Sequence, residues 1–179
     1  MNEIIENIIT RRSIKSYDKS KKVEKEKLDK ILEAGTYAAC GMGAQSPLIV
    51  VVQDEKIREK LRKMNLKAMG KTGNEAIDPF YSAPIIVIVL ADKSIMTYKE
   101  DGSLVIGNMM NAAHSLNVDS CWIHRAYEEF ESEEGKELLK SWGIDENKYV
   151  GVGHCILGYR NCEYPSSKPR KKDYIKYNN

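Results

Sequence analysis

The chain has 179 residues, of which 42% are hydrophobic and 30% are charged, and its formal net charge at pH 7 is +2. This length and composition are typical of one globular domain, so we expect residues 1–179 to form a single domain. A charge so close to neutral argues against a protein built to bind nucleic acid, and the sequence has no apolar run long enough to cross a membrane.

The sequence contains four cysteines: Cys40, Cys121, Cys155 and Cys162. None of them forms a CxxC pair, and the acidic start "MNEIIENIIT" does not resemble a secretory signal, so we expect reduced thiols in the cytoplasm. The three histidines lack the HExxH and HxxxH spacings of metal ligands, and we therefore expect no metal site.

The first half of the chain predicts three helices and one strand. Isoleucines at helical spacing predict a short helix that ends near Thr10, and residues 23–39 form a second amphipathic helix. Residues 46–54 predict a fully buried strand because their apolar run is continuous. Residues 55–70 predict a helix that ends at Gly70, and the polar segment 71–84 predicts a loop.

The second half predicts strands at 85–91, 119–124 and 148–160, with an amphipathic helix at 131–143. Residues 101–118 predict a helix that begins at Ser103 and is apolar almost all round, so it should be buried in a core or against a partner subunit. The expected class is α+β, with a mixed central sheet flanked by helices.

Three segments have the residue types of a binding site. In the first, "RRSIK", an extended chain would place Arg11, Ser13 and Lys15 on one side, and the tail "KPRKKDY" repeats the pattern with Lys168 and Arg170. Arginine, serine and lysine side chains suit a phosphate group. Two solvated charged segments remain the alternative, since charge runs are common on protein surfaces.

The second segment, "AACGMGAQSP" at residues 38–47, has small residues and two glycines between a helix and a strand. Such a loop lets backbone N–H groups approach a ligand closely, although it matches neither the GxGxxG nor the P-loop pattern. An ordinary turn remains the alternative.

The third segment, "DSCWIHRAYEEF" at residues 119–130, combines a flat Trp122 with the donors His124 and Arg125. A planar heterocycle could lie against it, but a structural histidine remains the alternative. A Cys121–His124 nucleophile pair is disfavoured, because strand geometry would place these side chains on opposite faces.

Taken in order, these segments resemble the nitroreductase family of dimeric, FMN-binding, NAD(P)H-dependent oxidoreductases. The matching motifs are "RRSIK", the small-residue loop "GMGAQSP", the helix and strand "GSLVIGNMMNAAHSLNVDSCWIHR", and the final strand "GHCILGY" with its basic tail. They cover nearly the whole chain, and the resemblance makes solvated surface segments a much weaker explanation of the cations.

The resemblance implies a cofactor site made of many residues. It assigns the FMN phosphate and ribityl chain to Arg11, Arg12 and Ser13, and the flavin N1 and O2 region to Lys15. Lys168 and Arg170 are the other half of the phosphate site. The remaining implied contacts are the loop from the second subunit, Ala39, Cys40, Gly41 and Gly43, and the segment that lines the isoalloxazine, Trp122, Ile123, His124 and Arg125.

The resemblance further implies hydride transfer from NADH or NADPH, followed by reduction of a small nitroaromatic, quinone or flavin-like acceptor in a ping-pong cycle. It also implies a homodimer with FMN at the interface, and no side chain is assigned as catalytic. An FMN-binding carrier or redox sensor without turnover is the alternative. The least favoured alternative function is a nucleic-acid or anion-binding module, because the overall charge is near neutral.

The chain departs from the family pattern at two places. It reads Gly43-Ala44-Gln45-Ser46-Pro47 where many members read N-x-Q-P-W, so the asparagine contact is missing. It also has Trp122 and His124-Arg125 where many members have Pro or Glu-Gly. These differences affect the expected substrate more than the expected flavin. Asn74 is the candidate for a polar flavin contact from the loop 71–84.

Overall fold

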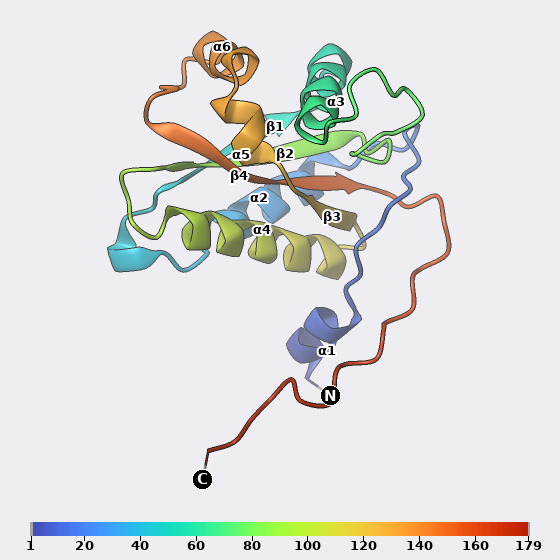
Figure 1. Ribbon diagram of the computed structural model, residues 1–179. Coiled ribbons are helices and arrows are strands. Elements are labelled where there is room, and N and C mark those ends of the chain that lie inside the picture. Colours follow the sequence, from blue (N-terminus) through green and yellow to red (C-terminus); the bar gives the residue numbers. More distant parts are fainter. Residues whose placement is uncertain (1, 179) are drawn as a thin grey trace.

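A computed structural model of the chain describes residues 2–178. A four-stranded sheet lies between two layers of helices (Figure 1). In the order β1-β2-β4-β3 all neighbouring strands are antiparallel, and among the described residues parallel pairing is limited to one bridge between Ser13 and Ser120. The strands are β1 (Pro47–Val52), β2 (Ile85–Asp92), β3 (Asp119–Ile123) and β4 (Tyr149–Gly158). The α+β class with a central sheet flanked by helices is confirmed, but the prediction of a mixed sheet is wrong, because every pair of neighbouring strands is antiparallel.

The helices divide the hydrophobic core into two halves, one on each face of the sheet. The lower half lies between the sheet and α2 (Lys25–Thr36) and α4 (Tyr98–Ser115). The upper half lies under α3 (Glu55–Ala68), α5 (Ala126–Glu131) and α6 (Glu133–Ser141). The short α5 was not predicted from the sequence, where its six residues are too few to show a helical period.

The position of each strand in the sheet determines how much of it is buried. The central strand β2 is buried along its whole length except at Asp92, as its continuous apolar run predicts. The prediction of full burial for β1 is wrong, because β1 is an edge strand with most of its residues only partly buried and Val51 36% exposed. The two sequences look alike, and only the strand order distinguishes them.

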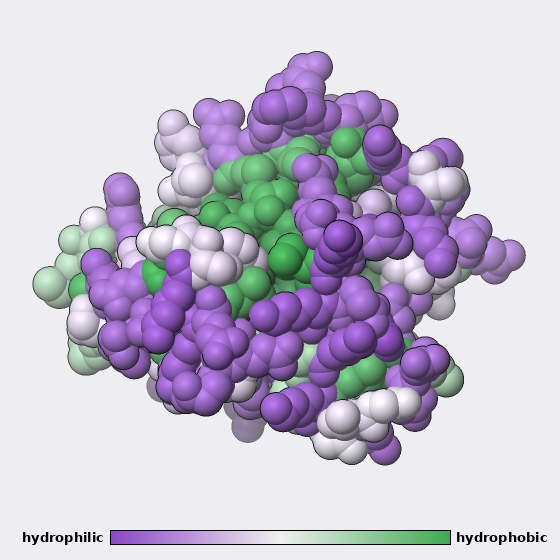
Figure 2. Space-filling view, turned by 90° about the horizontal axis from the view of Figure 1, so that it is seen from above, coloured by the Kyte–Doolittle hydropathy of each residue, from purple (hydrophilic) through white to green (hydrophobic). Residues whose placement is uncertain are grey.

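On the upper face, apolar surface appears among mostly hydrophilic side chains (Figure 2). Partly buried apolar side chains pack here against the upper core from β1, from α3 and from the region around α6: Leu48, Val50, Ile57, Trp142 and Ile144. This face therefore covers its core incompletely within one chain.

Helix α4 begins earlier than the sequence predicts. Its N-cap is Thr97, and the predicted cap Ser103 lies inside the helix, where its hydroxyl donates to the Lys99 carbonyl at 2.6 Å. Val105, Ile106 and Met109 face the core, whereas Leu104 is 48% exposed. One chain thus leaves part of α4 uncovered at Leu104, and burial of that part against a partner subunit stays a prediction.

The end of α3 agrees with the prediction. Gly70 has a φ of +66°, and the Lys71 amide donates to the Leu66 carbonyl at 2.8 Å, which completes a left-handed helix cap. Residues 71–84 then form the predicted loop, without a helix or strand.

Helix α1 (Glu3–Thr10) and the chain after β4 both extend below α4, away from the sheet (Figure 1). The apolar face of α1 has little cover, since Ile4, Ile5, Ile8 and Ile9 are 71%, 51%, 54% and 55% exposed. Two polar contacts attach the helix to α4: Asn7 Nδ2 donates to the Asn111 carbonyl at 3.0 Å, and Thr10 Oγ1 lies 2.9 Å from His114 Nε2.

Across residues 2–178, none of the helices is both long and apolar enough to cross a lipid bilayer.

Candidate functional site

The segment after α1 runs in extended form along the free edge of β3. The Ile14 amide donates to the Ser120 carbonyl at 3.1 Å, and the parallel bridge joins Ser13 to Ser120. Ile14 is fully buried, whereas Ser13 and Lys15 are exposed. The alternation expected for an extended chain is therefore present, and it leaves a hydroxyl and an ammonium group accessible at the same sheet edge.

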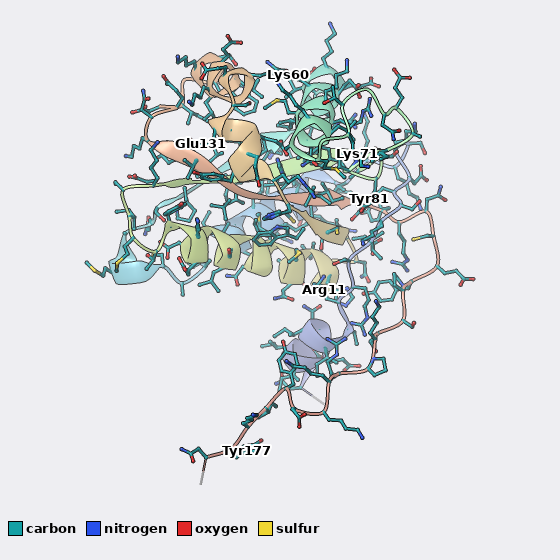
Figure 3. The ribbon with its side chains drawn as sticks, viewed as in Figure 1. Arg11, Lys60, Lys71, Tyr81, Glu131 and Tyr177 are labelled. Atoms are coloured by element: carbon teal, nitrogen blue, oxygen red, sulfur yellow. The ribbon has the colours of Figure 1, made fainter. Side chains whose placement is uncertain are left out.

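Arg11 and Arg12 lie at the junction of α1 with the body of the protein (Figure 3 labels Arg11). Arg12 Nη1 donates to the carbonyls of Ile9, at 2.7 Å, and Arg11, at 2.8 Å, so part of this side chain caps the end of α1. Arg11 Nη1 and Arg12 Nε are buried, but neither donates to an acceptor within residues 2–178.

A buried guanidinium nitrogen without an acceptor is costly, because the lost hydration is not replaced. An anion from outside the chain would supply the acceptor. The two arginines, together with the accessible Ser13 and Lys15, fit a phosphate group at this edge.

Cys121 lies in the core beside this edge. Burial raises the pKa of the Cys121 thiol, although hydrogen bonding by Ser13 and the nearby Lys15 and Arg11 cations act in the opposite direction. The thiol is therefore protonated at neutral pH. Because His124 is exposed while Cys121 is 4% exposed, the structure also gives no support to a nucleophilic pair.

The segment Trp122–Arg125 does not present all its side chains to one site. Trp122 lies under the sheet against Ile106 and Gly153, where a Cβ on Gly153 would come within 2.8 Å of the indole ring. Ile123 is buried on the other face, His124 is exposed, and Arg125 has a φ of +81°. Trp122 and Ile123 thus belong largely to the core.

The backbone of this segment is better placed for binding than its side chains. The Ser120 carbonyl faces away from β4 toward Ile14. Since backbone groups of a strand alternate in direction, the N–H groups of Trp122 and His124 face the same free edge. The segment around Ser13 covers this edge at Ser120, and the donors farther along β3 are available to a ligand.

The loop 38–47 is held in place by Asp101, a residue that the sequence did not single out. Asp101 is 2% exposed, and its carboxylate accepts from the Gly41 amide at 2.9 Å, the Ser46 hydroxyl at 2.8 Å and the Thr97 hydroxyl at 3.2 Å. Burial raises the pKa of Asp101, but these three hydrogen bonds outweigh it and the pKa is lowered overall. The sequence gives little signal for it, because Asp101 stands beside the exposed Glu100 and before the predicted helix start at Ser103.

The tip of the loop is a short 3-10 turn, Gly41–Gly43. A Cβ at Gly41 would come within 2.3 Å of the Thr97 hydroxyl, so this position requires glycine. Met42 is fully exposed, and a cavity of about 270 Å³ under the loop is lined in part by Ala39 and Cys40. The loop therefore extends outward from a fixed base, and Gly43 lies at its exposed tip.

The basic tail is not close to the other predicted phosphate ligands in the single chain. Tyr164 attaches its beginning, since the hydroxyl donates to the Thr10 carbonyl at 2.9 Å. Farther on, Lys168 and Arg170 are exposed, and Arg170 Nη2 donates to the Lys168 carbonyl at 2.7 Å. The tail leaves the body beside α1 and ends far below it, as the position of Tyr177 in Figure 3 shows.

Loop 71–84 touches the same edge through Tyr81, whose carbonyl accepts from the Tyr17 amide at 3.2 Å. Tyr81 and Ser82 have positive φ values of 53° and 63°, a strained pair that the sequence did not indicate. Asn74 is exposed, and its side chain accepts from the Ala76 amide, as in a local turn.

A cavity of about 680 Å³ lies between α3 and this loop and is lined by none of the predicted site residues. Its lining mixes the cations Arg58 and Arg62 with the acids Glu59 and Asp78. The predicted site is instead an open edge, which needs a further surface to enclose a ligand.

His114 on α4 should titrate below its ordinary pKa of 6.5, because burial and then the Arg11 cation disfavour its protonated form. The unfolded chain binds this proton more readily, so the contribution of His114 to stability is present above pH 6.5 and is lost as the pH falls through the lower native pKa. An NMR titration of the ring protons should show the lowered value, and Arg11→Ala should raise it while Lys60→Ala should not. A native pKa at or above 6.5 would contradict this.

Comparison with known proteins identifies relatives of this chain. A family model described as the nitroreductase family matches residues 8–159. A protein of Staphylococcus aureus named as an NAD(P)H nitroreductase is 25% identical, over 90% of this chain and 88% of its own length.

Two crystal structures of nitroreductases with bound FMN have the same fold over 100% of both chains. The one from Bacteroides fragilis superposes with a TM-score of 0.89 at 29% identity. The one from Desulfitobacterium hafniense superposes with a TM-score of 0.87 at 24% identity. The family match over most of the chain agrees with the predicted resemblance, and the protein belongs to the nitroreductase family.

Proposed function

We propose that this protein is an FMN-dependent oxidoreductase that takes hydride from NADH or NADPH and reduces a small acceptor in a ping-pong cycle. The observation that carries the proposal is the buried Arg11 nitrogen without an acceptor, next to the exposed Ser13 and Lys15. The family match and the FMN bound in the related Bacteroides fragilis nitroreductase support FMN as the ligand.

Arg11, Arg12 and Ser13 would hold the phosphate end of FMN, and the backbone donors at the exit of β3 would lie along the ring. When bound, the flavin supplies the redox chemistry, accepting hydride and passing electrons on. The acceptor would be a small molecule of the nitroaromatic, quinone or flavin type. No side chain has to act as a nucleophile, in agreement with the protonated Cys121 thiol.

The visible spectrum of the purified protein after incubation with FMN tests this function directly. Anaerobic titration with NADH and with NADPH should bleach the bound flavin, and an acceptor panel should then give parallel lines in double-reciprocal plots. A protein that takes up no FMN would refute the proposal. Bound FMN that neither nucleotide reduces would favour the carrier or redox sensor.

Lys15→Ala should lower the reduction potential of the bound flavin, because a cation beside N1 and O2 stabilises the charge that reduction creates. Lys15 is accessible to solvent, so the shift should be modest, about 20–40 mV, where about 30 mV corresponds to a tenfold change for two electrons. Spectroelectrochemical titration measures it, with Lys15→Arg as the charge-preserving control. An unchanged potential would exclude Lys15 from this role.

We also propose that two copies form a homodimer with FMN at the interface. The uncovered isoleucines of α1, the exposed Leu104 and the exposed tail residues Tyr174 and Ile175, 69% and 68% exposed, leave more apolar surface than a stable monomer usually presents. The open edge at Ser13 would then be closed by the partner, and loop 38–47 and the basic tail are the segments that extend far enough to contribute.

Ile8→Asp should dissociate this dimer, because the substitution places a charge on the apolar face of α1, where burial of one isoleucine is worth about 1.5–3 kcal/mol. The expected result in sedimentation equilibrium is a dimer constant weakened by at least about tenfold. Gln53→Asp adds the same charge at an exposed polar position and should not change it. A wild-type protein that binds FMN as a monomer would contradict the proposed interface.

A further inference from the structure

A cluster of three polar side chains is buried in the upper core next to the C-terminal end of β3, which we call the exit of β3. The proposed function does not use this cluster. Asn65 comes from α3, Glu129 from α5 and His154 from β4, and they are 0%, 1% and 0% exposed. Their surroundings are apolar, with Leu61 and Phe80 in the same core and the Phe80 ring edge-on to the His154 ring.

The three side chains form a chain of contacts that reaches the backbone of β3. Asn65 Nδ2 donates to the His124 carbonyl at 2.9 Å and also to Glu129 Oε1. Glu129 Oε2 lies 3.2 Å from His154 Nε2, and His154 Nδ1 lies 3.4 Å from the Ile123 carbonyl. Two successive carbonyl groups at the strand exit are thus engaged from inside the core.

Stability alone does not explain why a buried polar cluster of this kind is present. Removing carboxylate, imidazole and amide groups from water is costly, and well-packed apolar side chains of similar size often stabilise a core as well or better. Within residues 2–178 the cluster is only partly hydrogen-bonded, since Asn65 Oδ1, Glu129 Oε2 and His154 Nε2 have no hydrogen-bond partner. The bonds that Asn65 Nδ2 donates are made, and they define one arrangement of the backbone at His124. Through the bond from Asn65 to the His124 carbonyl, this cluster orients the peptide group between His124 and Arg125.

That peptide has a conformation that needs support. Arg125 is not a glycine, yet its φ is +81°, and its carbonyl accepts from the Glu129 amide at 3.0 Å at the start of α5. In a trans peptide the N–H points opposite to the C=O, so the Arg125 N–H points away from Asn65 and out of the core. Asn65 therefore fixes the direction of an outward donor beside the His124 N–H.

We propose that Asn65, supported by Glu129 and His154, is a positioning residue for the flavin. It holds the His124–Arg125 peptide so that the backbone donors at the exit of β3 face the bound ring. This inference rests on the proposed FMN-dependent function, and it assigns to a residue of α3, buried behind the strand, a role in the geometry of the cofactor site.

Asn65→Leu removes both N–H donors while keeping the number and branching of the side-chain heavy atoms. In the FMN-free protein, hydrogen exchange of peptides covering residues 121–127 should become faster than in the rest of the upper core. FMN binding should weaken by at least about tenfold, as expected for the loss of an oriented polar contact, and the visible bands of any bound flavin should shift.

Leu61→Ala is the matched control, because Leu61 lies one helical turn earlier on α3, is also 0% exposed and makes no polar contact. It should lower stability but leave FMN affinity and the flavin spectrum unchanged. If both variants lose FMN in proportion to their stability, or if Asn65→Leu keeps wild-type exchange, affinity and spectrum, the positioning role is refuted.

If Asn65→Leu does not fold, Asn65→Ala is judged by the same three measurements. Failure of the wild-type protein to bind FMN would instead remove the proposed function, so the two failures are distinguishable.

Discussion

Arg11→Ala should weaken FMN binding by about 10- to 100-fold, which corresponds to the roughly 1.5–3 kcal/mol of one hydrogen bond to a charged group. The same change should leave the FMN-free protein as stable as before, or slightly more stable, because it removes a buried cationic nitrogen that has no acceptor within residues 2–178. If Arg11 serves FMN binding, its loss should leave the free energy of unfolding of the FMN-free protein unchanged or slightly higher. If Arg11 serves stability, its loss should lower that free energy.

Fluorescence titration of FMN and urea unfolding without FMN together measure this effect. Lys60→Ala is the control, since it removes one positive charge from α3 on the other side of the sheet (Figure 3) and should change neither quantity. If Arg11→Ala retains full FMN affinity, or destabilises the FMN-free protein as strongly as it weakens binding, the phosphate assignment fails.

Asp101→Ala should destabilise the protein by about 3 kcal/mol and release the loop 38–47. The substitution leaves the Gly41 amide and the hydroxyls of Ser46 and Thr97 without their shared acceptor, and each buried unsatisfied donor costs about 1–3 kcal/mol before water partly replaces it. Because this loop is proposed to reach the second FMN site, binding should weaken as well.

Urea unfolding and hydrogen exchange of residues 38–46 test this prediction. Asp101→Asn keeps one acceptor for the Gly41 amide and should recover part of the lost stability. Glu100→Ala removes the neighbouring acid, which is exposed, and should have almost no effect. If the loop remains protected in Asp101→Ala, then Asp101 does not hold it.

Much of the fold could be predicted because local patterns are sufficient for it. The apolar run of β2 predicts a buried strand, and the glycine at position 70 marks the end of α3 through its positive φ. The extended segment with Ile14 inward and Ser13 and Lys15 outward follows from the period of two in the sequence. In each case neighbouring residues contain the information.

The predictions that were wrong or incomplete depend on distant residues. Burial of β1 depends on its place at the edge of the sheet, and the start of α4 depends on Thr97 rather than on the attractive cap residue Ser103. The sequence predicts Trp122 as a flat binding surface. In the structure its ring packs in the lower core, in space that is open because Gly153 on β4 has no side chain.

Local periodicity and motifs in a fixed order were sufficient to predict the family, most of the helices and strands, and the outward cations. Only the tertiary structure could identify Asp101 and Asn65. Each is a polar residue in a helix, and its importance comes from groups 60 and 59 positions away, the Gly41 amide and the His124 carbonyl. Hydrogen bonds across such separations form only when the chain has folded, so no local sequence pattern predicts them.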